Sequence, residues 1–252
     1  MNYILEGCVD SVESALIATE GGANRLELCA NLVIGGTTPT RAFVQRVKKE
    51  CKNRCHVLIR PRFGDFCYSK YEFEIMCEEI QQFCELGVEG IVIGALTPDG
   101  NLDLKQMEKF CQLAGERSVT LHRCFDVCAD PLRTLEEAKQ LRLQTILTSG
   151  QKNHCLEGKN CIKELVKRSE GKIDIMVGGG VNAEVISTLF GEVRATSYHM
   201  SGKVEIESRM HYRKNGISMG IEGMGEYSSF RTDYETIRRA ADTLKGLTGG
   251  QA

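Results

Sequence analysis

The chain has 252 residues, and its 32 Lys and Arg side chains against 34 Asp and Glu give a formal net charge of −2. This length fits one large domain, and the near-neutral charge offers no basic surface for nucleic acid. No apolar run reaches the roughly 18 residues of a membrane span, and the start MNYILEGCVDSVES lacks the regions of a signal peptide. We therefore expect a cytoplasmic protein without nucleic-acid or membrane partners, whose 12 cysteines are free thiols.

Short apolar runs rich in β-branched residues alternate with amphipathic stretches along the whole chain, which predicts a single (β/α)₈ TIM-barrel domain over residues 1–252. Helix starts support this count: Ser69 is followed by Glu72 in a capping box, and Asp130 precedes Pro131. The predicted strands are Tyr3 to Cys8, Asn24 to Cys29, His56 to Arg62, Gly90 to Ala95, Val119 to Cys124, Thr145 to Ser149, Ile173 to Val177 and Val193 to His199.

One long segment, residues 200–231, falls between the last predicted strand and the last helix, and we expect it to be an irregular loop. Loops of this length are usually lids, interfaces or disordered, and the sequence does not choose among the three. Association into a homo-oligomer, in the first place a dimer, through this segment or a helix face is also expected.

Alternation along the strands predicts which side chains enter the barrel, because successive residues point to opposite faces. On the second strand Leu26 and Leu28 face the helices, which leaves Glu27 and Cys29 facing inward. The same alternation predicts that three further pairs of side chains face the barrel interior, on the first, third and fifth strands: Glu6 with Cys8, Arg60 with Arg62, and His122 with Cys124.

Charged residues inside a barrel either pair with one another or act on a ligand. An internal salt-bridge network of Arg25, Arg60 and Arg62 with Glu6, Glu27 and Asp65 is one interpretation. The other is an active site, because these residues end their strands at the carboxyl face, where barrels carry out catalysis.

Two features predict a site for a small anion. Arg60 and Arg62 flank a proline in the segment IRPRFGDF, and their forked guanidinium groups suit a carboxylate or phosphate. Gly179 and Gly180 follow the seventh strand, where many barrels bind phosphate through backbone N–H groups.

The fifth and eighth strands each end near a histidine. His122 and His199, together with Glu27 and Asp126, predict either a general acid/base set or a metal site of two histidines and one carboxylate. The sequence leaves both interpretations open.

The cysteines divide into two kinds. Cys77, Cys84 and Cys111 recur at helical spacing among apolar residues and are expected to pack as small hydrophobic groups. Cys8 and Cys29 end neighbouring strands in matching Glu-x-Cys patterns, so their sulfurs should lie side by side; they are either inert thiols or a soft pair that favours Cu(I).

These motifs, in this order, resemble the CutC family, named for copper homeostasis. The matching stretches from Glu20 to Gly202 are EGGANRLELCANLVIGGTTPT, IRPRFGDFCYS, VIGALTPDG, TLHRCFD, ILTSG, GGGV and YHMSG. The resemblance implies a cytoplasmic (β/α)₈ barrel that controls copper levels, with Cu(I) held at the positions of Cys8 and Cys29. Cys124 departs from it, because the family usually has alanine there.

Two functional hypotheses follow. The first is a copper homeostasis protein that binds Cu(I) through Cys8 and Cys29. The alternative is a barrel enzyme of lyase, isomerase or hydrolase type that acts on a small anionic metabolite. In that enzyme Arg60 and Arg62 would bind the anion, and Glu27, His122, Asp126 and His199 would supply acid/base or orienting groups.

Overall fold

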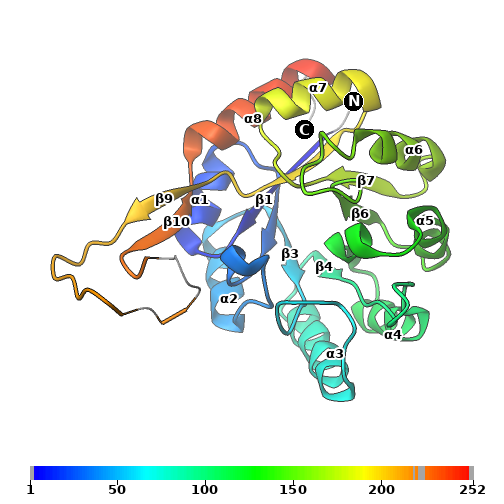
Figure 1. The fold of residues 1–252 in the computed structure, drawn as a ribbon, viewed down its shortest axis with the longest axis horizontal. Coiled ribbons are helices and arrows are strands. Elements are labelled where there is room, and N and C mark those ends of the chain that lie inside the picture. Colours follow the sequence, from blue (N-terminus) through cyan, green and yellow to red (C-terminus); the bar gives the residue numbers. More distant parts are fainter. Residues whose placement is uncertain (1–2, 218, 221–224, 250–252) are drawn as a thin grey trace.

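The computed structural model describes residues 3–217, 219–220 and 225–249, and its centre is a closed barrel of eight parallel strands in chain order, β1 to β8. Helices surround the barrel (Figure 1). The strands are β1 Ile4–Val9, β2 Arg25–Leu28, β3 Arg54–Leu58, β4 Gly90–Ile93, β5 Ser118–Leu121, β6 Thr145–Thr148, β7 Asp174–Val177 and β8 Ser197–Met200. This is the predicted TIM-barrel fold.

The helices follow the strands in turn. They are α1 Val12–Glu20, α2 Arg41–Glu50, α3 Lys70–Glu85, α4 Leu104–Ala114, α5 Pro131–Gln140, α6 Lys159–Ser169, α7 Ala183–Val193 and α8 Tyr234–Thr248, with two 3₁₀ helices, η1 Leu32–Ile34 and η2 Arg123–Val127. The predicted capping box at Ser69 and the Pro131 start of α5 are both present. None of the described helices is long and apolar enough to cross a membrane.

Two of the predicted strands are misplaced. The third ends at Leu58, so Arg60 and Arg62 lie on the connection beyond it, where strand alternation no longer applies. The eighth begins at Ser197, and Val193 is the last residue of α7.

The connection between β8 and α8 differs from the expected irregular loop. It begins with β9 Lys203–Glu207 and ends with β10 Ser228–Thr232, which pair antiparallel as a two-stranded ribbon separate from the barrel. The ribbon extends away from the barrel to one side (Figure 1). It was missed although Val204 and Ile206 alternate with charged residues, which is the period of a strand.

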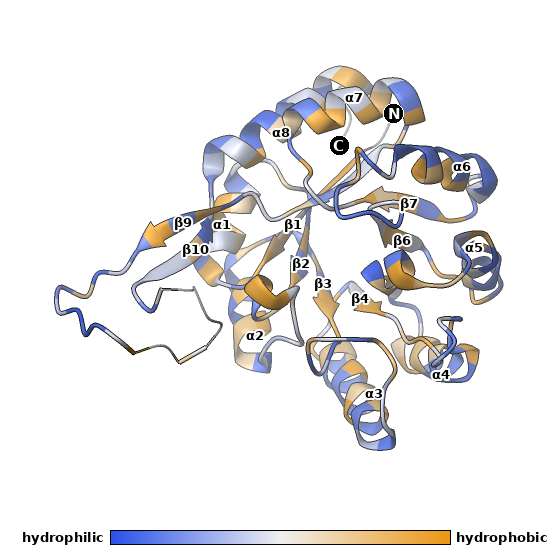
Figure 2. Ribbon diagram, in the orientation of Figure 1, coloured by the Kyte–Doolittle hydropathy of each residue, from blue (hydrophilic) through white to orange (hydrophobic). Residues whose placement is uncertain are grey.

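The core consists of two layers separated by the barrel wall. A large cluster between strands and helices contains Leu5, Leu26 and Leu28, together with the buried faces of the helices (Figure 2). Cys77, Cys84 and Cys111 pack against this cluster, as expected. A second, small cluster consists of Cys8, Cys29, Leu58 and Val92, so the barrel interior near β1 to β4 is apolar only around the two thiols.

Candidate functional site

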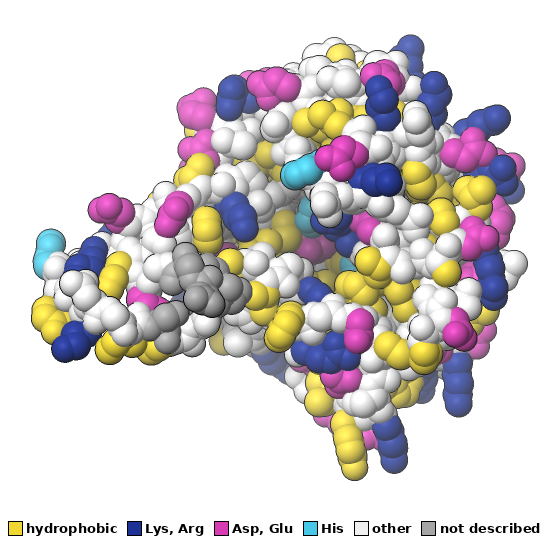
Figure 3. All heavy atoms as spheres, viewed as in Figure 1, with side chains coloured by type: hydrophobic (Ala, Val, Ile, Leu, Met, Phe, Trp, Pro, Cys, Tyr) yellow, Lys and Arg dark blue, Asp and Glu magenta, His cyan; other side chains and the backbone are white. Residues whose placement is uncertain are grey.

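A cavity of about 430 Å³ opens among the loops that follow the strands. Figure 3 shows a hollow near the middle of this face, with acidic, basic and histidine side chains in its walls. Residues from seven strands and the loops that follow them line it: Cys8, Glu27, Leu32, Ile34, Gly35, Gly36, Leu58, Arg60, Phe66, His122, Arg123, Leu147, Gly179, Gly180, Val181, His199, Met200, Ser201 and Gly202. This is the face on which barrel enzymes place their active sites.

The thiols of Cys8 and Cys29 lie side by side, with their sulfurs 3.8 Å apart. Cys8 is on β1, opposite Glu27 in the register with β2, and Cys29 directly follows β2. The Cys8 thiol also donates to Glu27 Oε1 at 3.4 Å. The hydrogen bond to Cys29, burial and the nearby Glu27 carboxylate raise the pKa of Cys8 well above its usual value. The hydrogen bond with Cys8 lowers the pKa of Cys29, but burial together with the Glu27 and Asp10 carboxylates raises it above its usual value, so both sulfurs carry protons at neutral pH.

Beside the thiols is a buried network of charges centred on Glu6, which has no exposed surface. Glu6 accepts from Arg25 Nε and is 2.8 Å from His199 Nδ1. Burial alone would raise the pKa of Glu6, but Arg25 and His199 lower it far below its usual value. Burial alone would lower the pKa of His199, but the Glu27 carboxylate, with Cys8 and Glu6, raises it well above the usual range. His199 is therefore an imidazolium between two carboxylates.

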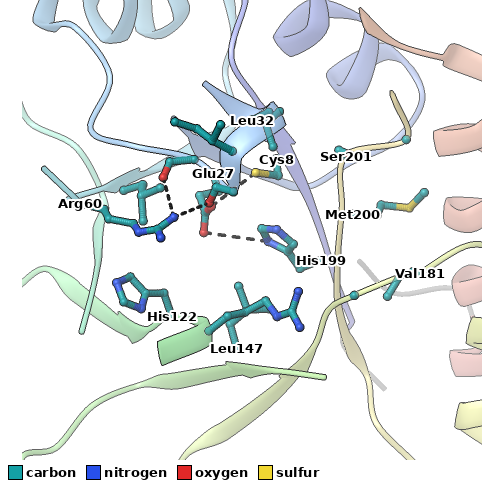
Figure 4. Close-up of a pocket in the computed structure, with 18 of the residues that line it drawn as sticks. Cys8, Glu27, Leu32, Arg60, His122, Leu147, Val181, His199, Met200 and Ser201 are labelled. Atoms are coloured by element: carbon teal, nitrogen blue, oxygen red, sulfur yellow. Dashed lines mark hydrogen bonds and ion pairs between the residues drawn. The ribbon is translucent and has the colours of Figure 1, made fainter. Parts of the chain in front are cut away.

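Three ligand atoms of different chemistry converge at this end of the cavity. One atom each from Cys8, Glu27 and His199 lie within 4.8 Å of one another, and the Cys29 sulfur is adjacent. In Figure 4 Glu27 and His199 face each other, with Cys8 behind Glu27. Thiolate and imidazole are ligands that copper accepts, so this group has the donors for a metal ion.

The opposite side of the cavity holds a basic residue without an acidic partner. Arg60 is 8% exposed, and its terminal nitrogens donate to three backbone carbonyls, those of Gly35, Gly36 and Gly64. Its guanidinium also lies 4.9 Å from the centre of the Phe66 ring. Arg60 forms no ion pair with any described carboxylate, and its buried Nε has no hydrogen-bond partner.

His122 directly follows β5 and lines the same wall as Arg60. Its Nδ1 accepts the backbone N–H of Cys124 at 3.1 Å, so in the neutral ring the proton is on Nε2. Nε2 is buried without a partner. Burial, reinforced by the positive charge of Arg60, lowers the pKa of His122 to about 3, so the ring is neutral at physiological pH.

The predicted glycine turn also lines the cavity. Gly179 and Gly180 have φ values of +90° and +80°, a region in which side chains are strained. A Cβ at Gly180 would come within 2.8 Å of His154. These positions therefore require glycine, and the turn leads directly into α7.

Three residues that the sequence placed in or near the barrel mouth do not line the cavity. Arg62 pairs with Asp65 and Glu72 at the rim, because it lies on a loop past the end of β3. Asp126 accepts from Thr148, Ser149, Gln151 and Arg123, and so holds the loop after β6 in place. Cys124 belongs to the large apolar cluster. The expectation of a third thiol beside Cys8 and Cys29 was wrong, since Cys124 lies in η2 after the strand.

Sequence reasoning missed Arg123, which lines the cavity beside the glycine turn. A guanidinium directly after His122 in the motif HRCFD was the available signal. It also missed the carbonyls of Gly35 and Gly36 as the support of Arg60, because nothing in a double glycine indicates which side chain it will contact.

The fold and the cavity together define a (β/α)₈ barrel protein with a thiol, carboxylate and imidazole group at its carboxyl mouth. The chain belongs to the CutC family, whose model matches residues 3–204. It is 42% identical over 241 residues to the family protein CutC of Pasteurella multocida, which covers 96% of this chain and 98% of the relative. It is 39% identical over 246 residues to the human protein named copper homeostasis protein cutC homolog, covering 97% and 90% of the two chains.

Solved structures share this fold. The copper homeostasis protein CutC of Streptococcus agalactiae superposes with a TM-score of 0.75 at 30% identity, over 79% of this chain and 98% of that one. A phosphoribosylanthranilate isomerase from Thermotoga maritima gives a TM-score of 0.57 at 14% identity, over 97% and 99% of the two chains. The second likeness shows the barrel fold alone.

Proposed function

We propose that this protein is a copper-homeostasis protein of the CutC type that binds Cu(I) through Cys8 and Cys29. The observation that supports this most directly is the 3.8 Å separation of the two sulfurs inside a barrel whose relatives are named for copper homeostasis. Soft thiolates select Cu(I) over harder ions. Copper is the cargo of the site in this proposal, and no turnover is implied.

The surroundings of the thiols suit exchange of a metal ion. Cys8 lines the open cavity, whereas Cys29 is behind it at 1% exposure, so an ion would reach Cys8 first. Both thiols are protonated in the metal-free protein, and binding must release their protons. Glu27, whose Oε1 accepts from the Cys8 thiol, is placed to receive one of them. His199 is near enough to add a third ligand after it loses its own proton.

The test is an anaerobic Cu(I) titration against a competing chelator. We expect the Cys8→Ser/Cys29→Ser double variant to lose high-affinity binding together with the ultraviolet thiolate-to-copper absorption. The matched control is Cys67→Ser/Cys161→Ser, which also removes two thiols but from an exposed loop and from α6. Equal affinity of the Cys8/Cys29 variant and the wild type would refute the proposal.

A further inference from the structure

The wall opposite the thiols has polar atoms that no protein group satisfies. Among the described residues, Arg60 Nε and His122 Nε2 are both buried without a hydrogen-bond partner, and both residues line the cavity. A buried polar atom without a partner is destabilising, because it has lost its hydrogen bonds to water and gained none from the protein. Two such donors beside one cavity indicate an acceptor that the protein itself does not supply.

The two donors belong to one small area. The Phe66 ring contacts both residues, with its centre 4.9 Å from the Arg60 guanidinium and 4.9 Å from the centre of the His122 ring. Because His122 Nδ1 is already occupied by the Cys124 N–H, only Nε2–H is available to a ligand. A guanidinium and a neutral imidazole N–H therefore offer donors on the same side of the cavity (Figure 4).

A second set of free donors lines another part of the same cavity. Gly180 and Val181 make no hydrogen bond within the part of the chain that the structure describes, so their N–H groups are free. They precede α7, whose first turn adds the positive end of an eleven-residue helix. The Arg123 guanidinium is close by, since a Cβ on Gly179 would come within 3.6 Å of Arg123 Cζ. These groups favour an anion.

The charged residues around the cavity also favour an anionic ligand. Arg123 is paired with Asp126, and His199 lies between Glu6 and Glu27, whereas Arg60 has no carboxylate partner among the described residues. The volume of about 430 Å³ falls in the range of sites for small metabolites. A cysteine pair that binds copper has no need of these groups on the far wall.

We propose that the cavity binds a small organic oxyanion that carries a carbonyl group, with the carbonyl oxygen held by Arg60 and His122 and the anionic group at Gly180 and Val181. The anionic group is a phosphate ester or a carboxylate. Glu27 Oε2, which also has no hydrogen-bond partner, offers an acceptor for a hydroxyl on the same molecule. This site does not depend on copper binding.

The experiment is isothermal titration of the metal-free protein with four probes: dihydroxyacetone phosphate, glycerol 3-phosphate, pyruvate and inorganic phosphate. We expect one of the two carbonyl compounds to bind best, and which one identifies phosphate or carboxylate as the anion. If dihydroxyacetone phosphate binds, it should bind about fivefold more tightly than glycerol 3-phosphate, which lacks the carbonyl; this is equivalent to the about 1 kcal/mol that a hydrogen bond contributes.

Two variants test the proposed contacts to the ligand. His122→Phe should remove the preference for the carbonyl. Arg60→Met should weaken binding at least about tenfold, because among the described residues that line the cavity it removes the charged group that has no ion-pair partner. Arg62→Met is the matched control and should bind as the wild type does, since Arg62 is outside the cavity. The Cys8→Ser/Cys29→Ser variant should also retain binding, so failure of the copper proposal and failure of this one are distinguishable.

One measurement needs no substitution. The His122 Nε2–H resonance of the wild-type protein should shift on addition of the bound probe, even if a variant does not fold. The inference is overturned if neither carbonyl compound binds with a dissociation constant below about 10 mM, equivalent to about 2.7 kcal/mol. It is also overturned if His122→Phe and Arg62→Met bind equally.

Discussion

The cavity has two walls that are built on opposite principles. In the β1–β2–β8 wall, Cys8, Glu27 and His199 line the cavity, and Glu6 and Arg25 are buried next to them; here charges are paired at close range and thiols are hydrogen-bonded. In the β3–β5–β7 wall, which includes Arg60, His122, Gly180 and Val181, Arg60 Nε, His122 Nε2 and two backbone N–H groups have no partner among the described residues. Under the two proposals above, the paired wall binds a soft metal ion and the unpaired wall binds a small organic anion.

The difference also concerns protons. His199 is charged because the carboxylates on two sides of it stabilise the imidazolium form. His122 is neutral because burial and the positive charge of Arg60 destabilise the imidazolium form. Two histidines in one cavity thus have opposite pKa shifts. Substitutions in each wall test whether this contrast holds.

The largest effect should come from removing the centre of the paired wall. Glu6→Gln leaves Arg25 and His199 buried without their carboxylate, so the free energy of unfolding at pH 7 should fall by about 3–5 kcal/mol. The pKa of Glu6 is lowered in the folded protein, so its contribution is present above the usual glutamate value of 4.5 and is lost as pH falls below it. Urea unfolding at pH 7 and pH 4 measures this.

The control for Glu6 is Glu50→Gln, which breaks an exposed pair with Arg46. It should change the free energy of unfolding by no more than about 0.5 kcal/mol. Equal destabilisation by the two variants would show that the network around Glu6 is solvated and that the wall is not paired as described.

Copper affinity should depend steeply on pH, because both thiols in the paired wall carry protons before binding. Release of two protons predicts an affinity that rises about 100-fold per pH unit below the thiol pKa values, or about 2.7 kcal/mol per unit. Cu(I) competition titrations between pH 6 and pH 8 measure the slope. A pH-independent affinity would mean that at least one thiol is already ionised or is not a ligand.

More of the paired wall than of the unpaired wall could be predicted from the sequence. Alternation along a strand fixes which residues face inward, so Cys8 and Glu27, which lie within strands, were placed by period alone. Arg60 and Arg62 have the same spacing but lie beyond the last strand residue, where the backbone turns freely. Arg60 lines the cavity, whereas Arg62 pairs with Asp65 and Glu72 outside it.

Contacts within loops could not be predicted in the same way. Asp126 has the sequence position of a catalytic carboxylate, yet its oxygens are occupied by Ser149 and neighbouring groups. The tautomer of His122 depends on one backbone N–H two residues further on, which is a matter of local turn geometry. The sequence pattern therefore predicted the barrel and the strand residues that face its interior. The hydrogen bonds and protonation of the loop residues could be seen only in the structure.

The pH dependence of stability should separate the walls further. The pKa of His122 is lowered to about 3 in the folded protein, so its contribution to stability is present above about pH 6.5, the unfolded value, and is lost as pH falls toward 3. His122→Phe removes this titration, so the difference in unfolding free energy between wild type and variant should change by about 1.4 kcal/mol per pH unit between pH 6 and pH 4.

For the exposed His211, substitution by Phe is the corresponding control, and it should leave the pH profile of the wild type unchanged in shape. If His122→Phe also leaves it unchanged, the pKa of His122 is the same in the folded and unfolded states, because only a difference between the two makes stability depend on pH. The opposite pKa shifts of the two histidines would then be lost.

The smallest effect is expected at the rim. Arg62 is about one-third exposed and its pairs with Asp65 and Glu72 lie in solvent, so Arg62→Met should cost no more than about 1 kcal/mol of stability. Raising the salt concentration should reduce that cost, because exposed pairs are screened. Thermal unfolding of the two proteins at low and high salt measures it. A cost above about 3 kcal/mol would place Arg62 with the buried pairs and contradict the boundary between rim and cavity.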